Sequence, residues 1–151
     1  MKRVALFAGA ALLAAALPVL AQDAGVKPED AIKYRKGVMT AMSWQMRPLA
    51  AMVKGARPFD RAQFLKSAQA VAALSLLPYE GFTPGSDKGD TRALEKIFAE
   101  RAKFDETAKR FQEDAAKLVQ VAQGTDENAM RNQFGAVAKH CNSCHDDFRR
   151  K

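Results

Sequence analysis

Cysteine and histidine are scarce in this sequence, with two of each among 151 residues. Two cysteines exclude the framework of several disulfides that stabilises many small secreted proteins. A regular alternation of apolar and polar residues is also missing over any useful length, which argues against β-strands. No segment repeats along the chain, so an α-solenoid is excluded as well. These absences indicate an all-α protein.

Long apolar runs are missing except at the N-terminus. At the start of the chain, Lys2 and Arg3 are positively charged. A stretch rich in alanine and leucine follows up to Leu17, and a short segment that ends in small residues reaches Ala21. This order is typical of a secretory signal peptide, which we expect to be cleaved after Ala21. A membrane anchor is the alternative, but the run is short and rich in alanine for one. Residues 1–21 are then the signal peptide, and residues 22–151 form one domain.

The net charge is +7 at pH 7, yet no uninterrupted basic stretch explains it. Lysine and arginine alternate with aspartate and glutamate along the chain, a pattern typical of solvated helix faces. The charge therefore does not indicate a nucleic-acid partner.

The most specific motif lies at the C-terminus, where Cys141, Cys144 and His145 form a Cys-x-x-Cys-His sequence. This is the attachment motif of haem c, in which both thiols bond the porphyrin and the histidine ligates the iron. On a helix these three residues share one face. We expect one covalently bound haem c per chain, with His145 as the axial ligand. Because haem c is attached outside the bacterial inner membrane, the motif and the signal peptide together predict a periplasmic protein.

Other uses of two nearby cysteines fit the sequence less well. A thioredoxin-like redox site needs a βαβ context and usually lies at a helix start. A structural zinc site needs a second pair of cysteine or histidine ligands, which the sequence lacks. A structural disulfide would close a very small loop and would leave the histidine unexplained.

Four segments repeat apolar residues every three or four positions, as on one face of a helix. They are residues 28–55, 60–77, 91–123 and from 125 or 126 to the C-terminus. Pro48 should kink the first helix or end its regular part early, and Asp60 is a potential N-cap of the second. The long connection, residues 78–90, contains Tyr79 and Phe82, which would cap a cofactor or plug the end of a bundle. We therefore predict an antiparallel up-and-down four-helix bundle with covalently bound haem c.

With these features the chain resembles the cytochrome c′ family, the four-helix cytochromes of the proteobacterial periplasm. The resemblance covers the whole mature chain and rests on residues 28–36 (PEDAIKYRK), 76–82 (LLPYEGF) and 141–149 (CNSCHDDFR). The position of the haem motif in the last helix separates this family from small cytochromes c, which carry it near the N-terminus. The resemblance implies a five-coordinate, high-spin haem with His145 as the proximal ligand.

The resemblance also implies roles for residues outside the motif. Met39 would pack an apolar side chain over the free face of the haem, and Arg35 would contact a propionate. Lys36, where the family often has glutamine, and Asp90 would lie close to the haem. Arg149 would influence ligand binding beside the proximal histidine.

The expected function is the binding of nitric oxide and, more weakly, carbon monoxide, together with one-electron redox change. Oxygen should bind less well, because bound oxygen is stabilised by a hydrogen-bond donor and Met39 offers none. The alternative is a low-spin electron-transfer cytochrome in which the sulfur of Met39, Met42 or Met46 ligates the iron. We expect that the protein is not an enzyme, because the sequence shows no distal histidine and arginine pair for peroxide cleavage. His140 lies off the face of the motif, and we expect it to be solvated or to cap a helix.

The expected partners are diatomic gases, a second copy of the chain and a redox protein. The homodimer would form through the first two helices, with Met52, Phe59 and Leu65 in an exposed apolar patch. Tyr34 and Trp44 would pack inside the bundle or contribute to the dimer surface. We expect that the protein does not bind nucleic acid, and that it has no membrane span after the signal peptide is cleaved.

Overall fold

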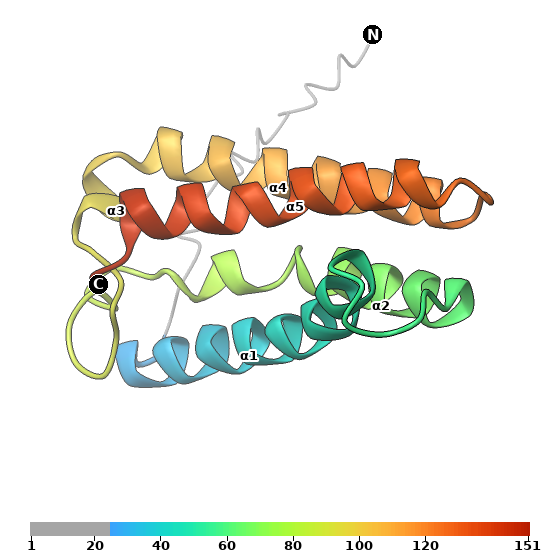
Figure 1. Cartoon of the computed structure of the whole chain (residues 1–151). Coiled ribbons are helices and arrows are strands. Elements are labelled where there is room, and N and C mark those ends of the chain that lie inside the picture. Colours follow the sequence, from blue (N-terminus) through green and yellow to red (C-terminus); the bar gives the residue numbers. More distant parts are fainter. Residues whose placement is uncertain (1–24) are drawn as a thin grey trace, which may run out of the picture.

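The computed structural model describes residues 25–151, so the expected signal peptide, residues 1–21, lies outside the described residues. The long helices are α1 (Pro28–Val53), α2 (Arg61–Leu74), α4 (Arg101–Ala122) and α5 (Glu127–Phe148). Two short elements, η1 (Pro78–Gly81) and α3 (Lys96–Ala99), lie between α2 and α4. The long helices run alternately up and down (Figure 1), which confirms the predicted four-helix bundle. Within residues 25–151 no helix is both long enough and apolar enough to span a bilayer.

Side chains cap the starts of α2 and α5, close to where the sequence predicted that these helices begin. Asp60 accepts a hydrogen bond from the backbone N–H of Gln63 at 3.0 Å, and Asp126 caps α5 in the same way. These caps satisfy N–H groups that have no partner within the helix. Of the two alternatives expected for Pro48, an early end of the regular part is wrong, because α1 continues through it to Val53, and a kink stays a prediction.

The third predicted helix, residues 91–123, is interrupted in the structure. Residues 91–95 are not helical, α3 is a single turn, and the chain bends at Glu100 before α4 begins. The cause is the C-terminal tail. The backbone N–H of Leu94 donates to the carbonyl of Phe148 at 3.0 Å, and that of Arg150 donates to the carbonyl of Arg92 at 2.8 Å. Pairing with the tail replaces the helical hydrogen bonds of this segment.

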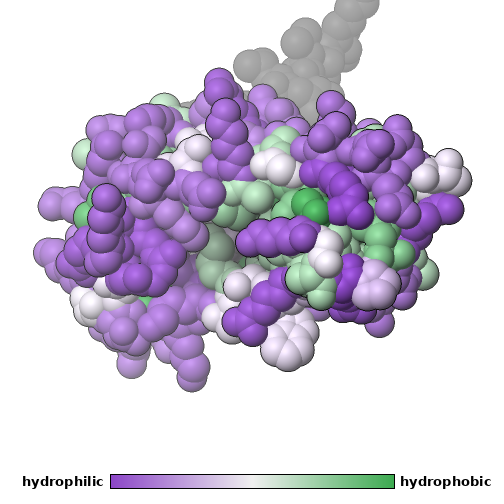
Figure 2. Space-filling model, in the orientation of Figure 1, coloured by the Kyte–Doolittle hydropathy of each residue, from purple (hydrophilic) through white to green (hydrophobic). Residues whose placement is uncertain are grey.

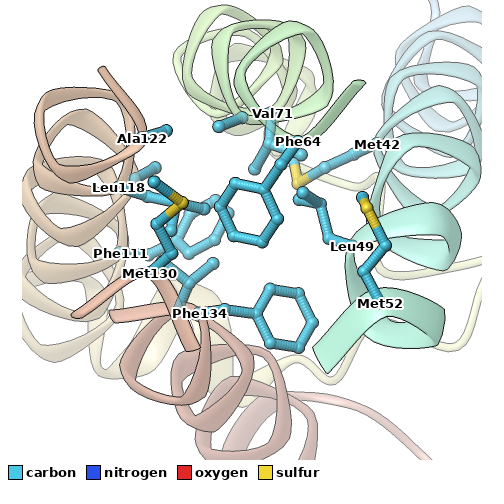
Figure 3. Packing of buried hydrophobic residues seen from close by; sticks show 13 residues of the cluster. Met42, Leu49, Met52, Phe64, Val71, Phe111, Leu118, Ala122, Met130 and Phe134 are labelled. Atoms are coloured by element: carbon cyan, nitrogen blue, oxygen red, sulfur yellow. The ribbon is translucent and has the colours of Figure 1, made fainter. Parts of the chain in front are cut away.

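Two groups of buried residues hold the bundle together. The larger one fills the space between the long helices and includes Phe64, Leu118 and Met130, none of which is exposed (Figure 3). The smaller one, which we call the aromatic cluster, consists of Ile97, Phe104 and Phe148, with Tyr79 and Phe82 packed against it. Cys141 packs against the larger group and Cys144 against the aromatic cluster. The cysteine motif therefore lies where the two groups meet.

The four long helices do not pack equally on one another. Helices α1 and α2, α2 and α4, and α4 and α5 pack along much of their length, whereas α1 and α5 touch over a short stretch. Figure 2 shows the face with α1 and α5, which is hollowed between them and has apolar residues at its floor. We call this opening the α1–α5 seam.

The apolar patch expected for a dimer is only partly present. Met52 is completely buried in the larger core, so the expectation that it is exposed is wrong. Phe59 and Leu65 are half-buried and also pack on that core. Trp44 on α1 is instead the large apolar side chain of this surface, with 67% of its area exposed.

Candidate functional site

The cysteine motif lies in the last two turns of α5, as the sequence predicted. Cys141 and Cys144 are half-buried, His145 is exposed, and all three line one hollow in the α1–α5 seam. This hollow has a cavity volume of about 50 Å³ and is open to solvent on one side. The other residues that line it come from α1, η1, α4 and α5 and are Met39, Met42, Tyr79, Thr107, Phe111 and His140. The fold thus brings the motif together with Met39, which is more than 100 residues away along the chain.

Both thiols of the motif are free and neutral at pH 7. Burial raises the pKa of the Cys141 thiol. Burial, followed by the neighbouring Cys141 and Asp147, raises the pKa of the Cys144 thiol to about 11. A redox-active Cys-x-x-Cys pair has a lowered thiol pKa, because the thiolate is the reactive form. The site therefore has the opposite electrostatics to a thioredoxin-like centre.

A site for a bare metal ion is not formed by these residues either. Within residues 25–151, no three side chains of histidine, cysteine, aspartate or glutamate come close enough to hold one ion. Structural zinc requires four such ligands. The side chains of the motif therefore do not form a structural zinc site by themselves.

The imidazole of His145 is suited to binding a metal. Partial burial of the ring and then the positive charge of Arg92 lower its pKa, while Asp146 acts in the opposite direction. A neutral imidazole is the form that binds metals. Arg149, one turn further along α5, places its Nη1 atom 3.4 Å from Nδ1 of His145. The basic side chain beside the histidine is therefore present where the sequence predicted it.

Arg35 is buried and fully engaged with the loop that follows η1. Its two terminal nitrogens donate to the carbonyl of Gly81 at 2.7 Å, to the hydroxyl and carbonyl of Ser86 at 2.6 and 2.5 Å, and to the hydroxyl of Thr91 at 2.8 Å. The ring of Phe82 lies 4.4 Å from the guanidinium carbon. Burial lowers the pKa of this arginine. These bonds tie the loop to α1, and the expected contact with a propionate stays a prediction.

Lys36 and Asp90 pair with each other on the surface. Their charged atoms lie 2.6 Å apart, and the side chain of Asp90 is almost completely exposed. The ion pair lowers the pKa of Asp90. Neither residue lines the hollow of the cysteine motif. Their expected proximity to a haem therefore also stays a prediction.

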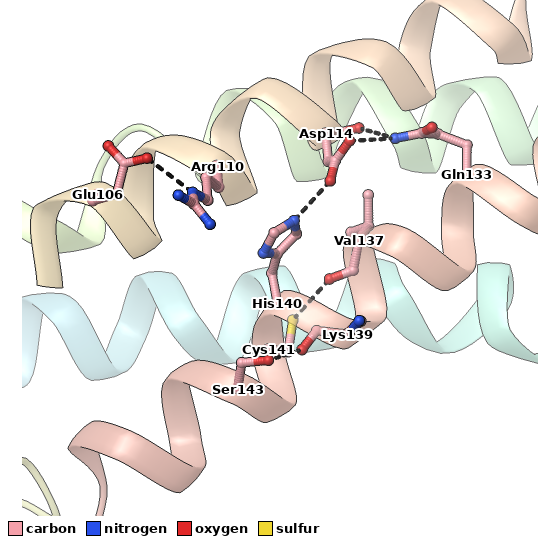
Figure 4. Close-up of polar contacts among 9 residues, drawn as sticks. All are labelled: Glu106, Arg110, Asp114, Gln133, Val137, Lys139, His140, Cys141 and Ser143. Atoms are coloured by element: carbon pink, nitrogen blue, oxygen red, sulfur yellow. Dashed lines mark hydrogen bonds and ion pairs between the residues drawn. The ribbon is translucent and has the colours of Figure 1, made fainter. Parts of the chain in front are cut away.

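His140 is not solvated as expected. It lines the hollow, and its Nε2 atom lies 2.7 Å from Oδ2 of Asp114 on α4 (Figure 4). Only 22% of its side chain is exposed. The sequence contained a signal for this position, because residues 137, 140, 141 and 144 follow a helical spacing toward the bundle. The missing information was the partner on α4.

The chain's own residues fit a haem c group. The two thiols are unpaired, and within residues 25–151 Nε2 of His145 has no hydrogen-bond partner. The floor of the hollow is supplied by Met39, Met42 and Phe111, which suits an apolar porphyrin face. One edge of the hollow opens along the α1–α5 seam, so a group larger than the cavity could extend out of it.

Comparison with known proteins agrees with this geometry. The model of the family described as Cytochrome C′ matches residues 30–149. A cytochrome c′ from Halomonas halodenitrificans is 43% identical over 129 residues, which cover 82% of this chain and 98% of that protein. The solved cytochrome c prime from Shewanella frigidimarina is 42% identical, with a TM-score of 0.82 over 84% of this chain and 99% of that one.

A third relative carries ligands in its solved structures. Variants of cytochrome c prime from Alcaligenes xylosoxidans have been solved as a nitric oxide complex and with carbon monoxide bound. They are 35% and 36% identical to this chain, with TM-scores of 0.78 and 0.77. They cover 84% and 83% of this chain and 98% of their own length in both cases.

Proposed function

Because the chain belongs to the cytochrome c′ family, we propose that it is a periplasmic haem c protein with a five-coordinate, high-spin iron that binds diatomic gases. Cys141 and Cys144 would hold the porphyrin by thioether bonds, and His145 would be the proximal ligand. Haem c supplies an iron that takes an axial gas ligand and changes its oxidation state by one electron.

The observation that carries this proposal is the composition of the α1 side of the hollow. Met39 and Met42 are the residues that α1 contributes there, and neither offers a hydrogen-bond donor. Met42 is also part of the larger core, with 5% of its area exposed, so its side chain is held by packing. A crowded, donor-free surface favours nitric oxide, which binds ferrous iron without a donor, over oxygen. The nitric oxide and carbon monoxide complexes of the Alcaligenes relative support the same assignment.

The spectrum of the purified holoprotein tests this proposal. Optical and electron paramagnetic resonance spectra are recorded in the ferric and ferrous states, with and without nitric oxide. A high-spin spectrum that changes when nitric oxide is added is the expected result. A low-spin spectrum with a methionine–iron charge-transfer band would contradict it, and would make electron transfer through a His/Met haem the leading function.

Replacement of Met39 by alanine is expected to raise the affinity of the ferrous protein for carbon monoxide roughly ten- to hundredfold. Crowding in a packed site costs about 1–3 kcal/mol, and each 1.4 kcal/mol corresponds to a factor of ten in affinity. Carbon monoxide titration followed by absorbance measures the change. Met46→Ala is the matched control, because Met46 packs on the larger core and does not line the hollow. An unchanged affinity in Met39→Ala would show that Met39 does not crowd the ligand.

We propose that Arg149 weakens the bond between His145 and the iron. A metal-bound histidine normally donates its other N–H to an acceptor, which strengthens it as a ligand. The guanidinium of Arg149 can only donate, and it lies 3.4 Å from Nδ1 of His145. The protein therefore supplies no acceptor from this side chain, and the bond of His145 to the iron should be correspondingly weak.

The remaining assignments concern location and assembly. We propose export to the periplasm with cleavage after Ala21, and a role in binding and electron exchange rather than as an enzyme. We also propose a homodimer through α1 and α2, supported by the exposed ring of Trp44. Sedimentation at micromolar concentration should give the mass of two chains, and the mass of one chain would contradict the dimer.

A further inference from the structure

The positive charge of the chain is concentrated in one layer of the bundle, which we call the α1–α2 layer. It consists of residues 31–78, which form most of α1, the whole of α2 and the loop between them. These residues include eight lysines and arginines but a single acidic residue, Asp60. Residues 1–30 contain three charges of each sign and residues 79–151 contain 13 of each, so the layer accounts for the whole net charge of +7. The expectation that both signs alternate along the chain is therefore wrong for this layer.

Most cations of the α1–α2 layer have no acidic neighbour. Arg35 is buried and bonded to the loop after η1, and Lys36 pairs with Asp90. Most basic side chains of α4, by contrast, lie beside a carboxylate, as Lys109 lies beside Glu113. The other six cations of the layer are exposed, and within residues 25–151 none of them forms an ion pair; they are Lys33, Arg47, Lys54, Arg57, Arg61 and Lys66.

Three of these cations and the only tryptophan of the chain form a row along the outer side of α1. Lys33, Trp44, Arg47 and Lys54 follow one another after 11, 3 and 7 residues, which places them on one side of a helix. All four are exposed, and the guanidinium carbon of Arg47 lies 5.7 Å from the centroid of the Trp44 ring. At about 1.5 Å per residue this row is about 30 Å long. Figure 1 shows α1 at an outer edge of the bundle, and we call these four residues the α1 row.

We propose that the α1 row binds the surface of an anionic lipid bilayer. A bilayer presents negative headgroups over a flat area, so it can meet an extended row of cations without matching a particular shape. The ring of tryptophan is favoured at the depth of the headgroups, where its apolar part and its N–H group are both satisfied. A protein partner fits less well, because a stable protein interface has a buried apolar core and Trp44 is the only large apolar side chain of the row.

A second copy of the chain is the other occupant proposed for Trp44. Two copies joined through α1 and α2 would bring two positive layers together, so salt should favour the dimer by screening their repulsion. Salt weakens the attraction between cations and an anionic bilayer. The ring of Trp44 should therefore be covered by a bilayer at low ionic strength and by a second copy at high ionic strength. The inference uses the proposed function only for export, which would bring the chain to a membrane surface.

Cosedimentation of the holoprotein with vesicles tests the proposal. Vesicles of pure phosphatidylcholine are compared with vesicles that also contain phosphatidylglycerol, and the protein in the pellet is measured on a gel. Binding is expected only to the vesicles with phosphatidylglycerol. It should be lost as the salt concentration rises from about 0.01 M to about 1 M, because the Debye length falls from about 30 Å to about 3 Å. Equal binding to both vesicles, or binding to neither, would overturn the proposal.

Two triple variants of equal net charge show which side of the protein binds. Each basic side chain near an anionic surface raises the affinity about fivefold. The combination of Lys33→Gln, Arg47→Gln and Lys54→Gln should therefore weaken binding about a hundredfold. The control replaces three exposed lysines of α4 and α5 by glutamine and should bind like the unmodified protein; these are Lys109, Lys117 and Lys139. Equal losses in the two variants would overturn the assignment to the α1 row.

The role of the aromatic ring is tested by Trp44→Ala. This variant keeps every charge, so it should weaken binding to phosphatidylglycerol vesicles and leave the salt dependence unchanged. An unchanged affinity would overturn the role given to Trp44. Retention of the unmodified protein on immobilised polyglutamate, without binding to vesicles, would show that the α1–α2 layer takes acidic proteins and would overturn the lipid assignment. None of these outcomes depends on the spin state of the iron, so this proposal and the proposed function fail separately.

Discussion

Replacement of both Cys141 and Cys144 by serine should abolish covalently bound haem. A hydroxyl does not form the thioether bond, so each single variant should keep one attachment and the double variant none. His145 alone cannot retain the cofactor under denaturing conditions, because a bond to iron breaks when the helix unfolds. Haem-dependent peroxidase staining after a denaturing gel measures the attached haem, and the double variant should give no signal.

The matched control lies between the two cysteines. Asn142 and Ser143 are exposed, and the hydroxyl of Ser143 donates only to the carbonyl of Lys139 within the same helix. Alanine at either position should leave the staining at the level of the unmodified protein. A double cysteine variant that still stains after denaturation would show that haem is attached elsewhere.

Replacement of Phe104 by alanine should lower the free energy of unfolding by about 3–5 kcal/mol. Phe104 is 1% exposed and occupies the centre of the aromatic cluster. Its ring meets those of Tyr79, Phe82 and Phe148 edge to face, with centroids 4.8–5.7 Å apart. These contacts join η1, α4 and the end of α5, so the cavity left by alanine would weaken three elements together. Urea unfolding followed by circular dichroism measures the loss.

The control for this variant is an exposed residue of the same helix. Lys109 has a largely exposed side chain that forms only a long ion pair with Glu113. Its replacement by alanine should change stability by no more than about 0.5 kcal/mol. Equal effects of the Phe104 and Lys109 variants would show that the aromatic cluster contributes little to stability.

Local sequence patterns were sufficient to predict the bundle and the attachment motif. Apolar residues at helical spacing located the four long helices, and Asp60 marked the start of α2. The break before α4 could not be predicted in this way. It depends on hydrogen bonds between residues 92–94 and the C-terminal tail, which are more than 50 residues apart. The helical pattern of residues 91–123 is real, but tertiary pairing overrides it.

The same limit applies to the site. Cys141, Cys144 and His145 are neighbours in the sequence, so their spacing was enough to predict them. His140 was misjudged because its partner, Asp114, is 26 residues away on another helix. The loop partners of Arg35 are 46 to 56 residues away from it. A single sequence does not reveal which distant polar groups will meet.

The α1–α5 seam has a consequence for how the chain reaches this structure. Each extensive helix pairing joins neighbours along the chain, whereas α1 and α5 stand at opposite ends of the described sequence. Pairings between neighbours form fast, and the closure of long loops slows folding. The bundle can therefore assemble stepwise from local contacts and leave its most distant pairing incomplete. A cofactor bonded to α5 and packed on α1 would take the place of that slow contact, so attachment would also complete the tertiary structure.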